Sequence, residues 1–416
     1  MTIRQLTPTE FVHYEAICQK VFFHEPRVNS RQKLQDPAAH ASEDDLIWGA
    51  FNEAGNMCAG LVVIPLTLRM NTAASLANAI GGVVTLPEAR GQRCIHQIMA
   101  AAFRHMREGG QVFSILYPFS FPYYRQFGYE MALADQRAEI PLERFFHYKY
   151  PARLESIDAN ADAAPFKLVY EKFTAQYNLA IVRTDENWAE MLDRDPYDDL
   201  AFTFLHRDEA GHPDAYVLYT VDKNEEEGDK LDIEELAWTT PAGLHAIFGF
   251  FGKLGAEFTH IIWSPPSDML MQSLFPDPSE VDVEWEAAGM NRIINVCAAL
   301  ETLAAPAGSG WVTIAVTDAF LPENSGLYCV EWANGKLNVR SNTPSEAAVT
   351  AATALSPTVE AASAPDLITD IETLAQLVTG YLTPADAQYK KGIIVNSHTR
   401  LTALFPRKTL YMKERY

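Results

Sequence analysis

Long apolar runs are missing from this sequence. Nowhere do hydrophobic residues approach the ~20 in a row that a membrane-spanning helix needs. The N-terminus, Met1-Thr2-Ile3-Arg4-Gln5, also lacks the apolar core of a secretory signal. We therefore expect a cytoplasmic protein that has no membrane partner.

Closely spaced cysteines are missing as well. The chain has five cysteines, and no two of them have the spacing of a zinc site: Cys18, Cys58, Cys94, Cys297 and Cys329. Reduced and mostly buried thiols account for such a scattered set. We expect no metal site.

Positive charge is scarce. The chain has 33 Lys and Arg against 54 Asp and Glu, a net charge of −21, which argues against a nucleic acid or an anionic membrane as partner. The excess lies in the middle third, because residues 146–294 carry 11 Lys and Arg against 29 Asp and Glu. That charge either keeps the surface solvated or concentrates a cationic amine near a cleft, and both interpretations stay open.

The length predicts more than one domain, because single cores usually stop growing beyond ~250–300 residues. Changes in charge and pattern divide the 416 residues into 1–145, 146–294 and 295–416. The first part predicts an α/β sandwich. Its expected elements are a helix over 9–22, a hairpin over 46–64, a strand over 80–86, a helix from 95 and a strand over 112–117.

The turn between the strand over 80–86 and the helix from 95 has the features of an anion site. One helix face collects Ile95, Ile98, Met99, Ala102, Phe103 and Met106, and Gly109-Gly110 ends the helix. Free amides at the start of a helix and the helix dipole both attract a diphosphate, and Arg90 and Arg93 add positive charge. An arginine-rich helix start without this role is also common.

Two further features suit acyl transfer. If strand 80–86 splays from strand 112–117, the amides of Val83 and Thr85 can face a thioester carbonyl. Tyr124, within Tyr123-Tyr124-Arg125-Gln126-Phe127-Gly128-Tyr129, could protonate a departing thiolate. The alternative for these tyrosines is aromatic packing.

The rest of the chain repeats the pattern and then changes. A strand over 232–238, a helix from Pro241 and a strand over 259–263 repeat the order of the first part without a glycine- or arginine-rich turn, as in a degenerate copy. The last part predicts strands over 311–318 and 327–332, a hairpin turn at Asn334-Gly335 and a helix over 367–377. Residues 342–365, rich in Ala, Ser, Thr and Pro, predict a linker or a short helix.

Two motifs together resemble a known family. Val83-Val84-Thr85-Leu86-Pro87-Glu88-Ala89-Arg90-Gly91-Gln92, followed by Tyr124-Arg125-Gln126-Phe127-Gly128-Tyr129, resembles the coenzyme A core of GNAT-type N-acetyltransferases, and more narrowly the Eis (enhanced intracellular survival) group. The resemblance implies an α/β (α+β) fold of two tandem GNAT-type domains, the second degenerate, followed by a sterol-carrier-protein-like α/β domain. Val316-Thr317-Asp318, Pro322-Glu323-Asn324-Ser325-Gly326 and Leu404-Phe405-Pro406 carry the likeness of the third domain.

The resemblance also implies roles for particular residues, with acetyl-CoA as co-substrate. The acetyl carbonyl would meet Val83, Val84 and Thr85, while Phe119 and Ser120 would complete the cofactor wall. Tyr124 matches the general acid of the family, and the C-terminal carboxylate of Tyr416 matches the general base. A homohexamer is implied too. The coenzyme A diphosphate would meet Gly91, Gln92, Arg93, Cys94, Ile95 and His96.

The motif departs from the family pattern in two places. Arg93 stands where the family usually has glycine, so its side chain must either lie outside the turn or crowd the diphosphate. Thr85 replaces a more usual valine, which should be harmless because its amide is the functional group.

We therefore expect an acetyl-CoA-dependent N-acetyltransferase acting on primary amines of a small cationic acceptor. The acceptor would be an aminoglycoside, a polyamine or a lysine side chain, and the acidic middle domain suits each of them. Two alternatives are a lipid- or sterol-binding carrier, suggested by the third domain, and a non-catalytic assembly protein that retains the GNAT fold.

Overall fold

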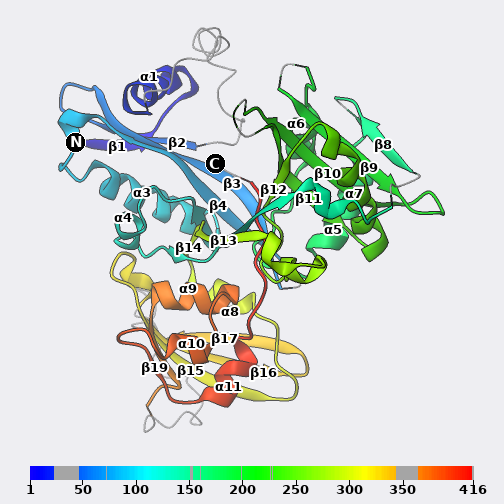
Figure 1. Ribbon diagram of the computed structural model, residues 1–416. Coiled ribbons are helices and arrows are strands. Elements are labelled where there is room, and N and C mark those ends of the chain that lie inside the picture. Colours follow the sequence, from blue (N-terminus) through cyan, green and yellow to red (C-terminus); the bar gives the residue numbers. More distant parts are fainter. Residues whose placement is uncertain are drawn as a thin grey trace. The chain divides into compact units, whose positions relative to one another are not determined.

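The structure is a computed structural model (Figure 1), which describes residues 1–22, 46–71, 73–149, 153–159, 161–197, 199–224, 226, 228–342 and 364–414. The chain forms two compact units. Unit 1 comprises Met1–Ala132, Gly289–Lys408 and Glu414–Tyr416, and unit 2 comprises Leu133–Ala288 and Thr409–Lys413. No helix within the described ranges is long and apolar enough to cross a membrane.

The first sheet of unit 1 has seven described strands in the order β1-β2-β3-β4-β5-β14-β6. Helix α1 covers one face and α3 the other (Figure 1). Neighbouring side chains of β3 alternate accordingly, since Leu61 packs under α3 and Val62 packs toward α1. The elements are β1 (Thr2–Gln5), α1 (Phe11–Phe22), β2 (Leu46–Phe51), β3 (Met57–Met70), β4 (Ala73–Thr85), α3 (Cys94–Glu108), β5 (Phe113–Leu116), α4 (Phe121–Arg125), β6 (Glu130–Met131) and β14 (Met290–Ile293).

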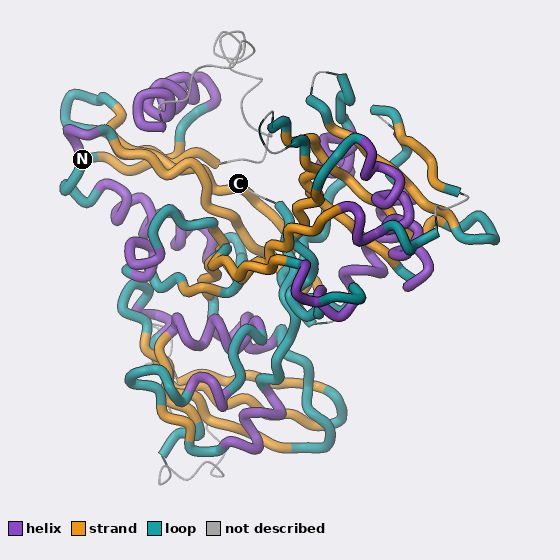
Figure 2. The backbone as a smooth tube through the Cα atoms, in the orientation of Figure 1, coloured by secondary structure: helices purple, strands orange, loops and turns teal. Residues whose placement is uncertain are grey.

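The second sheet of unit 1 belongs to the C-terminal part of the chain and has the order β17-β16-β15-β18-β19. Figure 2 draws its strands in orange and the helices of this part in purple. Asn334 and Gly335 both have positive φ, 53° and 73°, which confirms the hairpin turn predicted there. The elements are α8 (Val296–Glu301), β15 (Gly310–Thr317), β16 (Gly326–Ala333), β17 (Lys336–Asn342), β18 (Leu367–Asp370), α9 (Ile371–Thr379), α10 (Pro384–Ala387), β19 (Ile394–Val395) and α11 (His398–Leu404).

One predicted element of this part is wrong. The helix expected over 367–377 begins only at Ile371, because Asp370 is its N-cap and accepts a hydrogen bond from the Thr373 amide at 2.7 Å. Leu367 and Ile368 lie instead in β18, parallel to β15. Two apolar residues at the front of a helical pattern cannot be told from a short buried strand by periodicity alone. The linker predicted over 342–365 lies mostly outside the described residues.

Unit 2 is built on a sheet with the order β13-β7-β12-β11-β10-β9-β8. Helix α7 packs on one face, and α5, α6 and the tail residue Tyr411 pack on the other. The elements are β7 (Ala134–Pro141), β8 (Leu154–Ile157), α5 (Ala164–Thr174), α6 (Asp185–Leu192), β9 (Ala201–Arg207), β10 (Pro213–Asp222), β11 (Lys230–Trp238), α7 (Pro241–Lys253), β12 (His260–Trp263) and β13 (Asp282–Ala287).

Each of the two seven-stranded sheets takes a strand from beyond a predicted domain boundary. Strand β7 lies before residue 145 but pairs with β12 and β13 in unit 2. Strand β14 lies before residue 294 but pairs with β5 and β6 in unit 1. The domain boundaries at residues 145 and 294 therefore stay predictions. At each of them, one strand pairs with a sheet formed mainly by residues on the other side of the boundary.

Most predicted elements around the expected site are confirmed. The hairpin is β2 and β3 in antiparallel register, and the apolar face predicted from Ile95 is the buried face of α3. In unit 2, β11, α7 and β12 repeat the order strand, helix, parallel strand. These elements follow directly from local hydrophobic spacing, which is strongest where one face is fully buried.

Candidate active site

Strand β4 loses its parallel neighbour halfway along its length. It pairs with β5 at three positions, the last joining Ala79 to Ile115, but continues to Thr85. On its other edge the Leu86 amide donates to the Cys58 carbonyl of β3 at 2.9 Å. Because N–H groups alternate between the two edges of a strand, the amides of Val83 and Thr85 point toward the open edge. This is the splay predicted from the sequence.

A bulge precedes the open edge and depends on Gly82. Its φ is +54°, and its carbonyl accepts a hydrogen bond from the Tyr14 hydroxyl of α1 at 2.5 Å. A Cβ added at Gly82 would lie 1.9 Å from that hydroxyl oxygen. The pairing of β3 with β4 shifts register between Gly60 and Val62, opposite this bulge. Tyr14 and Gly82 thus set the direction in which the following strand residues leave the sheet.

We expect Gly82→Ala to lower the free energy of unfolding by about 2–4 kcal/mol, because it adds backbone strain and a steric clash. Chemical denaturation measures the loss. Gly55→Ala is the matched control, since Gly55 also has positive φ but has open space around its Cβ position, and it should lose about 1 kcal/mol. Equal losses for the two variants would contradict the steric role of Tyr14.

The turn between β4 and α3 presents free amides to solvent. Helix α3 is 15 residues long, no side chain caps its N-terminus, and its first turn contains no acidic residue. The first amides of such a helix lack an intrahelical acceptor, and the dipole adds partial positive charge. Gly91, with φ +80° and nothing within 4 Å of a Cβ position, leaves the approach open. The donor set fits a diphosphate, with Arg90 and Arg93 beside it.

Arg93 adopts the conformation that the family's glycine would favour. It is the N-cap of α3, with φ 58° and ψ 29° in the left-handed region. Arg93 therefore adopts the left-handed conformation itself, which imposes strain on this residue. Its side chain is one of those that line the pocket described below.

We expect Arg93→Gly to raise the free energy of unfolding by about 1 kcal/mol, because glycine adopts the left-handed conformation without strain. Arg93→Ala is the matched control: it removes the same guanidinium but keeps a Cβ in the strained conformation. Thermal and chemical denaturation compare the two. If Arg93→Ala proved as stable as Arg93→Gly, strain at this residue would be disproved.

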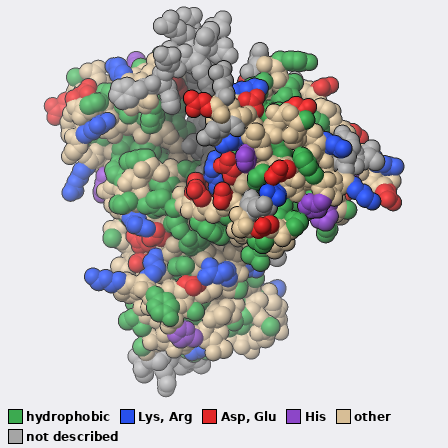
Figure 3. Space-filling view, viewed as in Figure 1, with side chains coloured by type: hydrophobic (Ala, Val, Ile, Leu, Met, Phe, Trp, Pro, Cys, Tyr) green, Lys and Arg blue, Asp and Glu red, His purple; other side chains and the backbone are tan. Residues whose placement is uncertain are grey.

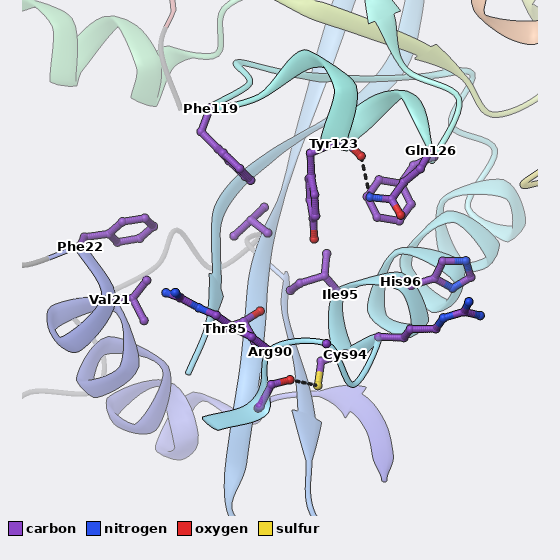
Figure 4. A pocket seen from close by; sticks show the side chains of 15 residues that line it. Val21, Phe22, Thr85, Arg90, Cys94, Ile95, His96, Phe119, Tyr123 and Gln126 are labelled. Atoms are coloured by element: carbon purple, nitrogen blue, oxygen red, sulfur yellow. Dashed lines mark hydrogen bonds between the residues drawn. The ribbon is translucent and has the colours of Figure 1, made fainter. Parts of the chain in front are cut away.

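These elements surround a pocket of about 820 Å³ in unit 1 (Figure 4). Phe119 and Tyr123 point into it from the segment after β5, and Val21 and Phe22 of α1 lie across the pocket from His96 of α3. The residues that line it are Val21, Phe22, Val83, Thr85, Ala89, Arg90, Gly91, Arg93, Cys94, Ile95, His96, Phe119, Tyr123, Gln126 and Phe127.

The pocket brings together most of the residues predicted to bind the cofactor, which are Val83, Thr85, Gly91, Arg93, Cys94, Ile95, His96 and Phe119. Among the described residues, three predicted ones lie outside its lining. Val84 is 1% exposed and packs toward α1, Gln92 donates to the Glu88 carbonyl at 3.1 Å, and Ser120 is the N-cap of α4. The contact of these three residues with the cofactor stays a prediction.

Sequence reasoning missed part of the wall. Val21 and Phe22 come from α1, about which local pattern says only that it is amphipathic. For Tyr123 the sequence indicates no role besides aromatic packing, yet its hydroxyl end points into the pocket (Figure 4). Its position next to Tyr124 was the one available signal.

Tyr124 lies one ring behind the pocket wall. It is 3% exposed and packs edge-on against Phe119 at 5.4 Å and Tyr123 at 5.2 Å between ring centroids. Burial, and to a lesser extent Tyr123, raises the pKa of Tyr124. The phenol is therefore held in its protonated form. Its role as acid stays a prediction, and the second predicted catalytic residue, Tyr416, lies outside the described residues.

Two other reactive groups have environments that oppose ionisation. Burial, followed by the nearby Cys58, raises the pKa of the Cys94 thiol, so this thiol stays protonated although it lies at the start of α3. Burial also raises the pKa of Tyr123. Within the described ranges, no group of three or more His, Cys, Asp or Glu side chains could hold a metal ion.

The corresponding turn in unit 2 has lost these features. The N-terminus of α7 is capped by Thr240, whose hydroxyl accepts from the Gly243 amide and donates to Asp214 Oδ2, both at 3.0 Å. Asp214 is buried there, and a Cβ on Gly243 would lie 2.9 Å from it. A diphosphate would meet a carboxylate and an amide that is already bonded. This is the physical basis of the degenerate copy.

Three family models match the chain in sequence. One described as an acetyltransferase (GNAT) domain matches residues 2–132, and a second with the same description matches residues 179–293. A sterol carrier protein domain matches residues 296–413. A search of curated proteins found no match.

Solved structures share the whole fold at low identity. A GCN5-related N-acetyltransferase from Anabaena variabilis has a TM-score of 0.84 at 19% identity, covering 100% of both chains. A probable N-acyltransferase of unknown function from Enterococcus faecalis has a TM-score of 0.84 at 18% identity, covering 100% of this chain and 99% of that one. Eis1 from Mycobacterium abscessus has a TM-score of 0.77 at 17% identity, covering 100% of both.

The two matched domains and the pocket define the class: the chain is a GNAT-type acyltransferase, and GNAT domains use acetyl-CoA. Its two GNAT domains are followed by a sterol carrier protein domain, and the chain shares its whole fold with Eis1 from Mycobacterium abscessus.

Proposed function

We propose that the protein is an acetyl-CoA-dependent N-acetyltransferase that acetylates a primary amine of a cationic acceptor. The observation that carries this proposal is one pocket that combines the open edge of β4 with the uncapped, acid-free start of α3. Bound acetyl-CoA would supply the activated acyl group as a thioester.

Different residues of the pocket would bind different parts of acetyl-CoA. The amides at the start of α3, with Arg90 and Arg93, would hold the diphosphate. The amides of Val83 and Thr85 would orient the acyl carbonyl and stabilise the negative charge that develops on its oxygen. The apolar rings of Phe119 and Phe22 would exclude water from the pantetheine channel.

Two groups would move protons. The Tyr416 carboxylate would accept the proton that the amine loses as its nitrogen bonds to the acyl carbon. Tyr124 would donate its proton to the sulfur as the carbon–sulfur bond breaks. The acyl group passes from sulfur to nitrogen, and the two proton transfers leave a neutral amide and a neutral thiol.

The acidic character of unit 2 supports a cationic acceptor. Several of its Asp and Glu side chains lie on the face visible in Figure 3. Polyamines, aminoglycosides and lysine-rich peptides all share the required charge and a primary amine.

A thiol-release assay with acetyl-CoA and a panel of these amines tests the proposal. We expect release with cationic primary amines, little release with neutral ones, and a rate that falls as salt rises. If no amine caused thiol release, the enzyme hypothesis would be rejected in favour of a non-catalytic assembly protein. Tryptophan quenching by a sterol, without thiol release, would instead support the lipid carrier.

The proposed assembly is a homohexamer in the cytoplasm, as in the family that the sequence resembles. Light scattering of the purified protein measures the mass directly. A monomer at micromolar concentration would contradict this part of the proposal without affecting the chemistry.

A further inference from the structure

The turn that joins β15 to β16, residues 318–325, is held together by one buried carboxylate. Asp318 Oδ1 accepts the amides of Phe320 at 3.1 Å and Leu321 at 2.9 Å. Its Oδ2 accepts the Asn324 side-chain amide at 3.0 Å. We call these residues the Asp318 turn. These hydrogen bonds fix the directions in which the side chains of Phe320 and Leu321 leave the third domain.

Those two side chains pack into the cofactor domain. The Phe320 ring contacts His96 at 5.1 Å, Phe127 at 5.3 Å and Phe103 at 5.6 Å between centroids, each nearly edge-on. Leu321 is buried in the same cluster beneath α3. His96 and Phe127 line the pocket on their other side. Phe320 is thus the second layer of the pocket wall, although it is more than 190 residues away in sequence from any residue in the first layer.

The same carboxylate also holds an arginine behind the Tyr124 segment. Arg292 donates from Nη2 to Asp318 Oδ2 at 2.5 Å, and both side chains are fully buried. A Cβ on Gly128 would lie 2.5 Å from Arg292 Nη1, so the guanidinium packs directly on this glycine. Gly128 also has φ +80°. The turn that follows α4 therefore packs against a buried positive charge, and Asp318 is its ion-pair partner among the residues that the structure describes.

A third contact reaches the far end of α3. Arg107 Nη1 donates to Asn324 Oδ1 at 2.9 Å and to the Ile294 carbonyl at 2.7 Å. Helix α3 is consequently held near its start through His96 and near its end through Arg107. Both contacts lead to the Asp318 turn.

We infer that the Asp318 turn positions the cofactor pocket, with Phe320 as the positioning residue that keeps His96 and Phe127 at their spacing. The inference rests on the proposed function, since it takes the pocket to be the coenzyme A site. It gives the sterol carrier protein domain a role in cofactor binding, distinct from lipid carriage. Packed side chains transmit such a constraint because protein interiors are dense and do not deform freely.

The test is calorimetric binding of free coenzyme A, followed by kinetics with acetyl-CoA. Phe320→Ala should weaken the Kd for coenzyme A on the order of tenfold, because a displaced wall loses several aligned contacts at once. The KM for acetyl-CoA should rise in parallel, while kcat at saturation changes less. Phe320→Leu keeps most of the apolar volume and should weaken the Kd only about threefold.

Leu401→Ala is the matched control. Leu401 is fully buried in α11 of the same domain and is not part of the pocket cluster. It should lower the Tm at least as much as Phe320→Ala and leave the Kd for coenzyme A unchanged. All measurements belong at a temperature where circular dichroism shows each variant folded. If Phe320→Ala does not fold, the Kd values for coenzyme A of Phe320→Leu and Leu401→Val are compared instead.

The outcomes separate the two proposals. A wild-type protein that binds no coenzyme A overturns the proposed function. A wild-type protein that binds it, with a Kd unchanged by Phe320→Ala or shifted equally by the Leu401 control, overturns the positioning role alone. A selective loss in the Phe320 variants supports both.

Discussion

Tyr124→Phe is expected to lower kcat roughly 10²- to 10⁴-fold, the range that a positioned general acid contributes. The substitution removes one oxygen and keeps the ring that packs against Phe119 and Tyr123. The Kd for coenzyme A and the Tm should therefore stay close to those of the wild type. Steady-state kinetics with a saturating amine measures the loss in kcat, and calorimetry checks the binding.

The pH dependence follows from the sign of the pKa shift. Burial first, and Tyr123 second, raises the pKa of Tyr124. A raised phenol pKa favours the neutral form, so the acid keeps its proton at every pH at which the protein is normally assayed. The wild-type kcat should accordingly show no alkaline decline below pH about 10, where an unperturbed tyrosine would titrate.

Tyr123→Phe is the matched control for this experiment. It lies next to Tyr124 on α4, loses the same oxygen, and lines the pocket. We expect it to change kcat by less than about tenfold, because it would contribute orientation rather than a proton. The reverse result, a large loss for Tyr123→Phe and a small one for Tyr124→Phe, would transfer the acid role to the residue on the pocket wall.

A peptide tag appended after Tyr416 is expected to lower kcat by a similar factor, roughly 10²- to 10⁴-fold, because it converts the proposed base into an amide that cannot accept a proton. The fold should survive. The preceding segment Thr409–Lys413 is anchored within unit 2, where Tyr411 is buried against Phe173 and Tyr177 and its amide donates to the Asn178 carbonyl at 3.0 Å. An extension beyond residue 416 leaves those contacts intact.

The same tag placed before Met1 provides the control, and it should leave kcat unchanged. A tag whose proteolytic removal regenerates the natural terminus adds a second control, because activity should return with the free carboxylate. Circular dichroism and coenzyme A binding confirm that each form is folded. Full activity while the C-terminal tag is still attached would rule out the terminal carboxylate as base.

Local sequence determined those parts of this protein whose backbone conformation depends on residues a few positions apart in the chain. The apolar spacing from Ile95 to Met106 fixed α3, because a helix buries residues three and four apart on one face. Asn334-Gly335 fixed a hairpin, because both residues tolerate positive φ. The turn with Gly91 and Arg93 indicated an anion site, because the amides at a helix start always lack intrahelical partners.

Tertiary structure decided what surrounds that turn. The pocket takes Phe22 from α1, and its second layer takes Phe320 from the third domain. The bulge at Gly82 is set by Tyr14, a residue distant in the chain. Strand β7 pairs with β12 in the sheet of unit 2, and strand β14 pairs with β5 in the first sheet of unit 1. Such contacts depend on which apolar surfaces meet once several elements are formed, and a local pattern states only that a face is apolar, not which partner covers it.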